Sequence, residues 1–160
     1  AKYNFQSSKQ FNMNLEQLKD VQASKIVRIG AHTQNHPILR NESDETSRKE
    51  IAESINDLEE LLNDKVHYFA YPNGSPELDY SEREVSYLKN CGIRMAFTTA
   101  KQNLSINSSP LEIPRYGISH GNAQFVKAKL LLGRYWEIIK NMKGVSEEDL
   151  RKKIQDIVDL

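Results

Sequence analysis

Helix-type and strand-type patterns alternate along this chain, and the alternation limits the folds that it can adopt. Short apolar runs at 26–29 and 66–71 lie on either side of a stretch, 43–63, in which apolar residues recur at helical spacing. The second run ends at Pro72, in a Pro-Asn-Gly turn signal. This order predicts an α/β fold built on a parallel sheet.

Capping patterns mark the starts of two further helices. Asn14 is followed three residues later by Gln17, and Ser81 by Glu84, so each pair combines an N-cap residue with a side chain that can reach back to it. Further strands are predicted over 94–99 and 111–118, and further helices over 122–141 and from 146 onward. We therefore predict a single domain over 1–160, with the architecture of an incomplete or distorted (β/α) barrel.

Composition excludes several classes of protein. Lys and Arg together number 22, as do Asp and Glu, so no overall basic field attracts nucleic acid. The single cysteine, Cys91, excludes an intrachain disulfide and a multi-cysteine zinc site. No apolar run reaches the roughly 18 residues that a membrane span needs. The predicted partners accordingly include neither nucleic acid nor a membrane-spanning segment.

Two histidines directly follow the first apolar run. His32 and His36 are four residues apart, and Pro37 helps to fix the turn that carries them. Divalent metals such as zinc accept imidazole ligands readily, and side chains that follow buried strands gather at the carboxyl end of a parallel sheet. The pair thus predicts a metal site. The alternative reading is an ordinary polar loop with a chance pair of histidines.

Two segments around these features resemble a known family. The run 29–37, IGAHTQNHP, resembles the His-(Ser/Thr)-x-x-His-Pro motif of the polysaccharide deacetylases, also called the NodB-homology family. The run 69–74, FAYPNG, is similar to the third motif of that family. Weaker similarity extends the match, in the same order along the chain, to roughly 13–119.

This resemblance implies a metal-dependent hydrolase that removes acetyl groups from a carbohydrate. It implies that His32 and His36 hold a divalent metal, zinc, together with an Asp as third ligand. It also implies that the backbone N–H of Asn73 stabilises the oxyanion, with Tyr71 and Pro72 beside the substrate. The implied architecture is the (β/α) barrel of the polysaccharide deacetylase type.

One motif of the family is missing. Two aspartates are expected on a strand upstream of the histidines, but Asp20 is the one aspartate before His32, and it lies in a predicted helix. The upstream segment is absent, or another chain supplies it, or the domain is a degenerate homologue that binds a glycan or a partner without turnover. We predict that this chain is incomplete for catalysis. An open sheet edge then favours a homo-oligomer.

Two further residues are candidates for catalysis. The third motif often begins with an Arg, where this chain has Ala70, and Arg115 on the fourth predicted strand can reach the same space. The alternative for Arg115 is an ion pair with a surface carboxylate. His120 is the candidate for the catalytic acid, because it follows the same strand. His67 precedes its strand and so lies at the wrong end of the sheet.

Overall fold

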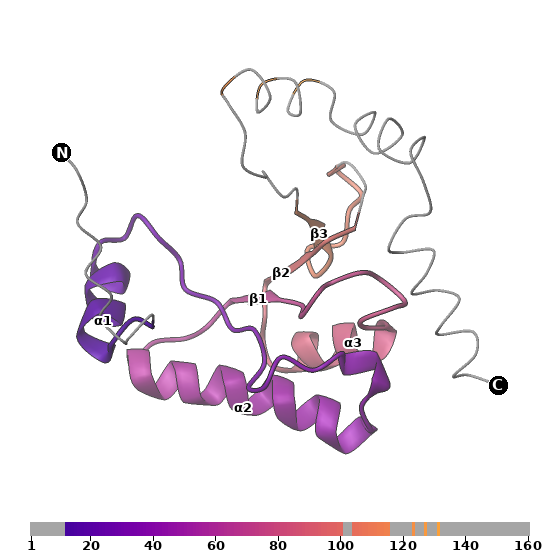
Figure 1. The fold of residues 1–160 in the computed structure, drawn as a ribbon, viewed down its shortest axis with the longest axis horizontal. Coiled ribbons are helices and arrows are strands. Elements are labelled where there is room, and N and C mark those ends of the chain that lie inside the picture. Colours follow the sequence, from indigo (N-terminus) through magenta and orange to yellow (C-terminus); the bar gives the residue numbers. More distant parts are fainter. Residues whose placement is uncertain (1–11, 101–103, 116–122, 124–126, 128–130, 132–160) are drawn as a thin grey trace.

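The computed structural model describes residues 12–100, 104–115, 123, 127 and 131. From α2 to β2 the described elements alternate between helix and strand, as predicted, whereas no strand separates α1 from α2 in the part of the chain described (Figure 1). They are α1 (Leu15–Ala23), the short 3-10 helix η1 (Leu39–Asn41), α2 (Asp44–Leu62), β1 (Tyr68–Ala70), α3 (Glu82–Asn90), β2 (Met95–Thr98) and β3 (Ile113–Pro114). Residues 123, 127 and 131 are helical, and the rest of the helices predicted after 121 lies outside the described residues.

The strands form a parallel sheet in the order β1-β2-β3. On the other edge of β1, Ala31 makes an isolated parallel bridge with Phe69. Helices α2 and α3 contact each other and lie on the same side of the strands in Figure 1. The predicted α/β fold with a parallel sheet is confirmed, whereas a complete barrel is not shown by the part of the chain described here.

Both predicted capping boxes are present. The Asn14 side chain accepts a hydrogen bond from the Gln17 backbone, and the Gln17 side chain accepts one from the Asn14 backbone, each at 2.9 Å. Ser81 and Glu84 make the equivalent pair of bonds at the start of α3. These bonds satisfy backbone N–H groups that have no partner within the first turn of a helix. The sequence therefore located these helix starts correctly.

The core lies between the sheet and the two helices α2 and α3. Phe69 of β1 is 1% exposed, and Tyr71, directly after β1, is fully buried. The ring of Tyr71 stacks on that of Tyr80, with centroids 3.7 Å apart and planes 9° apart. The largest other apolar side chains in this core are Leu39, Ile51 and Leu88. This packing fixes the position at which the chain leaves β1, and the candidate site begins there.

The predicted buried strand at 26–29 does not form. Ile26 is 90% exposed and Val27 is 48% exposed, and only Ala31 of this segment pairs with β1. The strands of a parallel sheet are buried when helices cover both of its faces, and residues 26–29 are not part of the sheet among the described elements. The prediction of a largely buried strand was therefore wrong. Oligomerisation through an open sheet edge stays a prediction.

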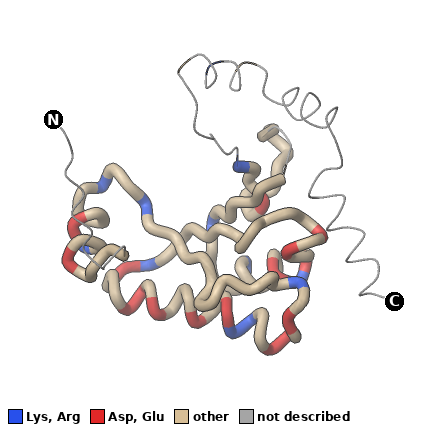
Figure 2. Tube along the Cα trace, viewed as in Figure 1, with Lys and Arg blue, Asp and Glu red and all other residues tan. Residues whose placement is uncertain are grey.

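Charged residues of both signs are spread along the described part of the chain, and acidic residues recur along α2 (Figure 2). None of the helices described here is both long enough and apolar enough to cross a membrane.

Candidate functional site

The carboxyl end of the sheet brings together segments that are far apart in the sequence. The chain leaves the sheet after Ala31, after β1, after β2 and after β3, and all of these segments are parallel. The chain therefore leaves every strand at the same end of the sheet, the carboxyl end, as expected for a parallel sheet. His32, the loop that starts at Tyr71, Thr99 and Arg115 are the first residues beyond these exits.

The two histidine rings converge. Their centroids are 4.8 Å apart, and their planes are inclined by 76°. His32 Nδ1 lies 2.6 Å from the carbonyl oxygen of Ala70, the last residue of β1. Because a carbonyl oxygen can only accept, Nδ1 carries the proton and Nε2 retains the free lone pair. Both side chains are exposed, so the nitrogens that remain free are accessible to a ligand.

The loop between the histidines is tightly turned. Thr33 and His36 have φ angles of 63° and 56°, in the left-handed region that residues other than glycine seldom adopt. The Thr33 hydroxyl donates to the carbonyl of His32 at 2.6 Å and accepts from the backbone N–H of His36 at 3.1 Å. These two bonds close the turn and hold His36 next to His32.

The third-motif segment forms a second turn beside the first. Asn73 has a φ angle of 55°, its side chain is exposed, and its carbonyl accepts a bond of 2.8 Å from the Thr99 hydroxyl. No hydrogen bond of its backbone N–H is found with any described residue. Pro72 is buried, and the buried Tyr71 hydroxyl donates to the carbonyl of Leu111 at 3.0 Å. The side chain of Tyr71 therefore belongs to the core, and its carbonyl alone lies near the turn.

The Arg115 side chain contacts the backbone at the ends of β1 and β2. Its Nε donates to the carbonyl of Thr98 at 3.2 Å, and its Nη2 lies 3.5 Å from the carbonyl of Tyr71. Burial lowers the pKa of this guanidinium. Gly74 lies within the same cluster, since a Cβ there would come within 3.4 Å of Arg115 Nη2. The sequence prediction that Arg115 approaches the third-motif loop agrees with this geometry, and its recorded partners are carbonyls rather than a surface carboxylate.

Two predicted parts of the site have no counterpart in the described residues. His120 lies outside them, so its role as catalytic acid stays a prediction. No group of three or more His, Cys, Asp or Glu side chains suited to a metal occurs within the described part of the chain. Within the described ranges, the imidazole pair thus offers two possible metal donors and no third.

Sequence reasoning missed two carboxylates that shape these loops. Asp79 is 1% exposed, accepts from the backbone N–H of Ser75 at 2.7 Å and lies 3.5 Å from Asn73 Nδ2. Glu50 of α2 accepts from the backbone of the histidine loop. An Asp a few residues after a Pro-Asn-Gly turn is a weak signal for such a role. Glu50 gives no signal, because it looks like any other charged residue of an amphipathic helix.

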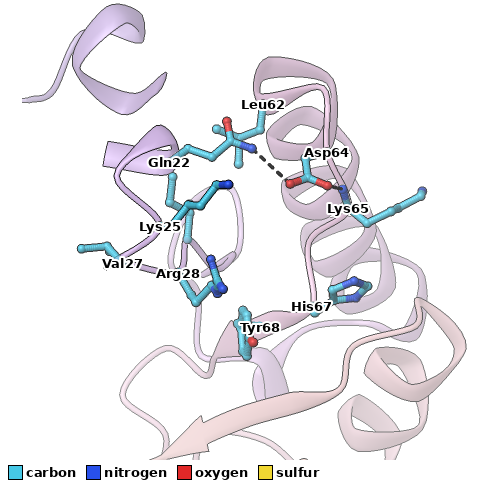
Figure 3. A pocket seen from close by; sticks show the side chains of 10 residues that line it. Gln22, Lys25, Val27, Arg28, Leu62, Asp64, Lys65, His67 and Tyr68 are labelled. Carbon is cyan, nitrogen blue, oxygen red and sulfur yellow. Dashed lines mark hydrogen bonds between the residues drawn. The ribbon is translucent and has the colours of Figure 1, made fainter. Parts of the chain in front are cut away.

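A hollow of about 550 Å³ lies at the opposite end of the sheet, near the start of β1 (Figure 3). Lys25 and Arg28 lie on one side of it, and Asp64 lies across from them, joined to Gln22 by a hydrogen bond of 3.2 Å. His67 also lines it, which confirms that this histidine is at the amino end of its strand. The hollow is separate from the converging histidines.

Comparison with known proteins gives matches for much of the chain. The family model for polysaccharide deacetylase matches residues 3–96. The structure of the Streptococcus pyogenes deacetylase PplD in complex with acetate is similar, with 25% identity, a TM-score of 0.56, and coverage of 65% of this chain and 44% of that protein. The structure of IcaB from Ammonifex degensii has 20% identity, a TM-score of 0.58, and coverage of 75% of this chain and 52% of that protein.

The chain spans about half the length of these two solved structures. No match was found among curated protein sequences. The family model nevertheless covers more than half of the 160 residues and includes both histidines and the turn at Pro72. The chain therefore belongs to the polysaccharide deacetylase family.

Proposed function

We propose that this chain forms part of a hydrolase that removes acetyl groups from an N-acetylated polysaccharide or glycoconjugate, with His32 and His36 holding a divalent cation, zinc. One observation carries the proposal: the two rings converge at the carboxyl end of a parallel sheet, with centroids 4.8 Å apart. Two imidazoles that bind one zinc ion through bonds of about 2.1 Å have centroids about 5 Å apart. Family membership supports the same reading, because polysaccharide deacetylases are generally metal-dependent.

The residues of this chain fit a cation in one specific way. The bond from His32 Nδ1 to the Ala70 carbonyl leaves Nε2 as the free donor, and such a bond also holds the ring in a fixed orientation. A divalent cation bound there supplies Lewis acidity and lowers the pKa of water in the site. The third ligand, an Asp, and the catalytic base come in this proposal from outside the described residues.

The loop after β1 serves the acetyl group in this proposal. The backbone N–H of Asn73 has no acceptor among the described residues and is available to donate to the oxygen of the acetyl carbonyl as charge develops there. Pro72 and the buried Tyr71 fix the start of the turn, and Arg115 holds its carbonyl side. His120 completes the proposal as the acid that protonates the leaving amine.

The proposed reaction class is supported by one neighbour. PplD was solved with acetate, and acetate is the acid released when an acetamide is hydrolysed. The fold of that protein is similar to this one over 65% of the present chain. A carbohydrate substrate is the partner that fits a deacetylase.

The second candidate is a non-catalytic module that binds a glycan or a protein partner. It is favoured by the incomplete donor set, since the described residues contain two converging imidazoles and no third ligand. In this case the chain alone has no activity on chito-oligosaccharides, and a strand that carries the missing Asp pair does not restore it. Turnover by residues 1–160 alone at about 1 per second or faster would contradict both this candidate and the proposed incompleteness.

Metal binding tests the proposal directly. Zinc binding by the purified chain is measured by calorimetry and by metal analysis, and it is compared with a variant that carries His32→Ala and His36→Ala. We expect measurable binding in the natural sequence and its loss in the double variant. His67→Ala is the matched control, because His67 lies at the other end of the sheet, and it should bind as the natural sequence does. Equal zinc binding in the double variant would eliminate the pair as ligands.

A further inference from the structure

The loop that carries the two histidines is held from outside by α2. Thr33 and His36 have left-handed backbone conformations, and each raises the free energy of the turn by about 1–2 kcal/mol. Between them, the amides of Gln34 and Asn35 belong to no helix or strand. A turn with this backbone persists when surrounding groups hold it, so the partners of these amides decide where the histidines lie.

One carboxylate accepts hydrogen bonds from both of these backbone amides. Glu50 Oε2 accepts from the backbone N–H of Gln34 at 3.0 Å and from that of Asn35 at 2.9 Å. Glu50 Oε1 accepts from the side-chain amide of Asn35 at 2.6 Å. Hydrogen bonds to an ionised acceptor are about twice as strong as those between neutral groups. Three such bonds from a single half-buried side chain fix the middle of the loop.

A second carboxylate of the same helix supports this arrangement. Asp57 Oδ2 accepts from the side-chain amide of Gln34. Glu50 and Asp57 are seven residues apart on α2, so they lie on the same face of the helix, two turns apart. The hydrogen bonds to Gln34 and Asn35 place the loop against this face, and acidic residues recur along α2 in Figure 2.

The protonation state of Glu50 agrees with this geometry. Burial acts to raise the pKa of Glu50, but the hydrogen bonds from Asn35 and Gln34 outweigh it, so the pKa lies below its ordinary value. The side chain is therefore ionised near neutral pH and accepts all three bonds. Both oxygens of this carboxylate are engaged by the amides of the histidine loop.

We infer that Glu50 is a positioning residue: by binding the amides of Gln34 and Asn35, it sets the turn that makes His32 and His36 converge. This inference rests on the proposed function, in which the two rings hold a cation. Glu50 acts without touching the cation or the substrate. Its removal should weaken metal binding while the histidines themselves are unchanged.

The test uses Glu50→Ala, Glu50→Gln and the control Glu53→Ala. Glu53 lies on the same helix, is exposed and pairs only with Lys49, at 3.8 Å, among the described residues. We expect Glu50→Ala to lose the exchange protection of the amides of Gln34 and Asn35 and to bind zinc at least about tenfold more weakly, as is typical for loss of an outer-shell partner. Glu50→Gln keeps one acceptor oxygen and should be intermediate, and Glu53→Ala should change neither quantity.

Two measurements separate the possible failures. If the natural sequence binds zinc and Glu50→Ala binds it equally well, the inference about Glu50 is overturned and the proposed function stands. If the natural sequence binds no zinc, the proposed function is overturned, and so is the role of Glu50 in metal binding. Amide exchange that is unchanged in both Glu50 variants would overturn the inference independently of any metal. Thermal unfolding shows whether each variant is folded. If Glu50→Ala does not fold, the same comparisons are made with Glu50→Gln.

Discussion

Replacing Gly30 by alanine should detach the histidine loop from the sheet. A Cβ at position 30 would lie 2.8 Å from the carbonyl oxygen of Tyr68 and 2.9 Å from its Cβ. Both distances are shorter than real Cβ contacts, and neither of these atoms is the end of a flexible side chain. The φ angle of Gly30 lies outside the left-handed region, so alanine meets no backbone penalty there. The destabilisation expected in the folded state is therefore steric.

The magnitude follows from the bonds that the clash would break. The backbone N–H of Ala31 donates to Tyr68 at 2.9 Å, and the carbonyl of Ala31 accepts from Ala70 at 3.0 Å. Losing these two bonds costs about 1 kcal/mol each, and residual overpacking costs about 1–3 kcal/mol. The lower entropy of the unfolded alanine chain returns about 0.4–1 kcal/mol. We expect the free energy of unfolding to fall by about 2–5 kcal/mol.

Urea unfolding, followed by circular dichroism, measures this change. Gly92→Ala is the matched control: its φ angle is 77° and no atom lies within 4 Å of the added Cβ, so it should cost only the backbone strain, about 1–2 kcal/mol. Zinc binding distinguishes the two variants further, since Gly30→Ala separates His32 from Ala70 and Gly92→Ala does not. A Gly30→Ala variant as stable as the natural sequence, with intact zinc binding, would refute the reasoning.

Further substitutions test the packing around the site. Tyr71→Phe removes the donor to the Leu111 carbonyl and should lower the free energy of unfolding by about 1–3 kcal/mol in urea titrations, because a buried acceptor loses its partner. Arg115→Met should cost about 1–2 kcal/mol by the same assay, since it keeps most of the apolar stem and loses the bonds to backbone carbonyls. Burial acts to raise the pKa of Glu84, but hydrogen bonds from Ser47 and from the helix cap outweigh it and hold the pKa below the ordinary 4.5. The stability that this carboxylate contributes is thus present above pH 4.5 and is lost as the pH falls through the lowered pKa. Between about pH 5 and pH 2, the free energy of unfolding should therefore depend on pH less steeply in Glu84→Gln than in the natural sequence.

The predictable parts of the fold are those set by local chemistry. The capping pairs at Asn14 and Ser81 were read correctly because each depends on residues three positions apart. The histidine pair was found because its spacing and its place after an apolar run are visible in the sequence. The run 26–29 misled the prediction, since its apolar residues look the same whether or not a second strand covers them. Burial depends on neighbours that a local pattern does not specify.

The parts of the site that were missed depend on long-range contacts. Glu50 reaches a loop 15 residues earlier in the chain, and only the packing of α2 against that loop shows that it meets these amides rather than solvent. Tyr71 illustrates the reverse case. Its place in the third motif predicts a position beside the substrate. In the structure its ring stacks on Tyr80 in the core, and its hydroxyl donates to the carbonyl of Leu111. A side chain that follows a strand can point to either the core or the site, and packing decides between them.

The link between the sheet and the proposed metal site can be tested without any metal. Ala70 ends β1, and its carbonyl is the partner of His32 Nδ1 at 2.6 Å, so the neutral ring of His32 must carry its proton on Nδ1. Nitrogen-15 NMR of the neutral histidine rings, recorded at about pH 8, should report the Nδ1–H tautomer for His32. His67 is the internal control, because its buried Nδ1 has no hydrogen-bond partner among the described residues and nothing there selects that tautomer. A proton on Nε2 of His32 would mean that the last carbonyl of β1 does not orient this ring, and the free donor that a cation requires would then be pointed back at the sheet.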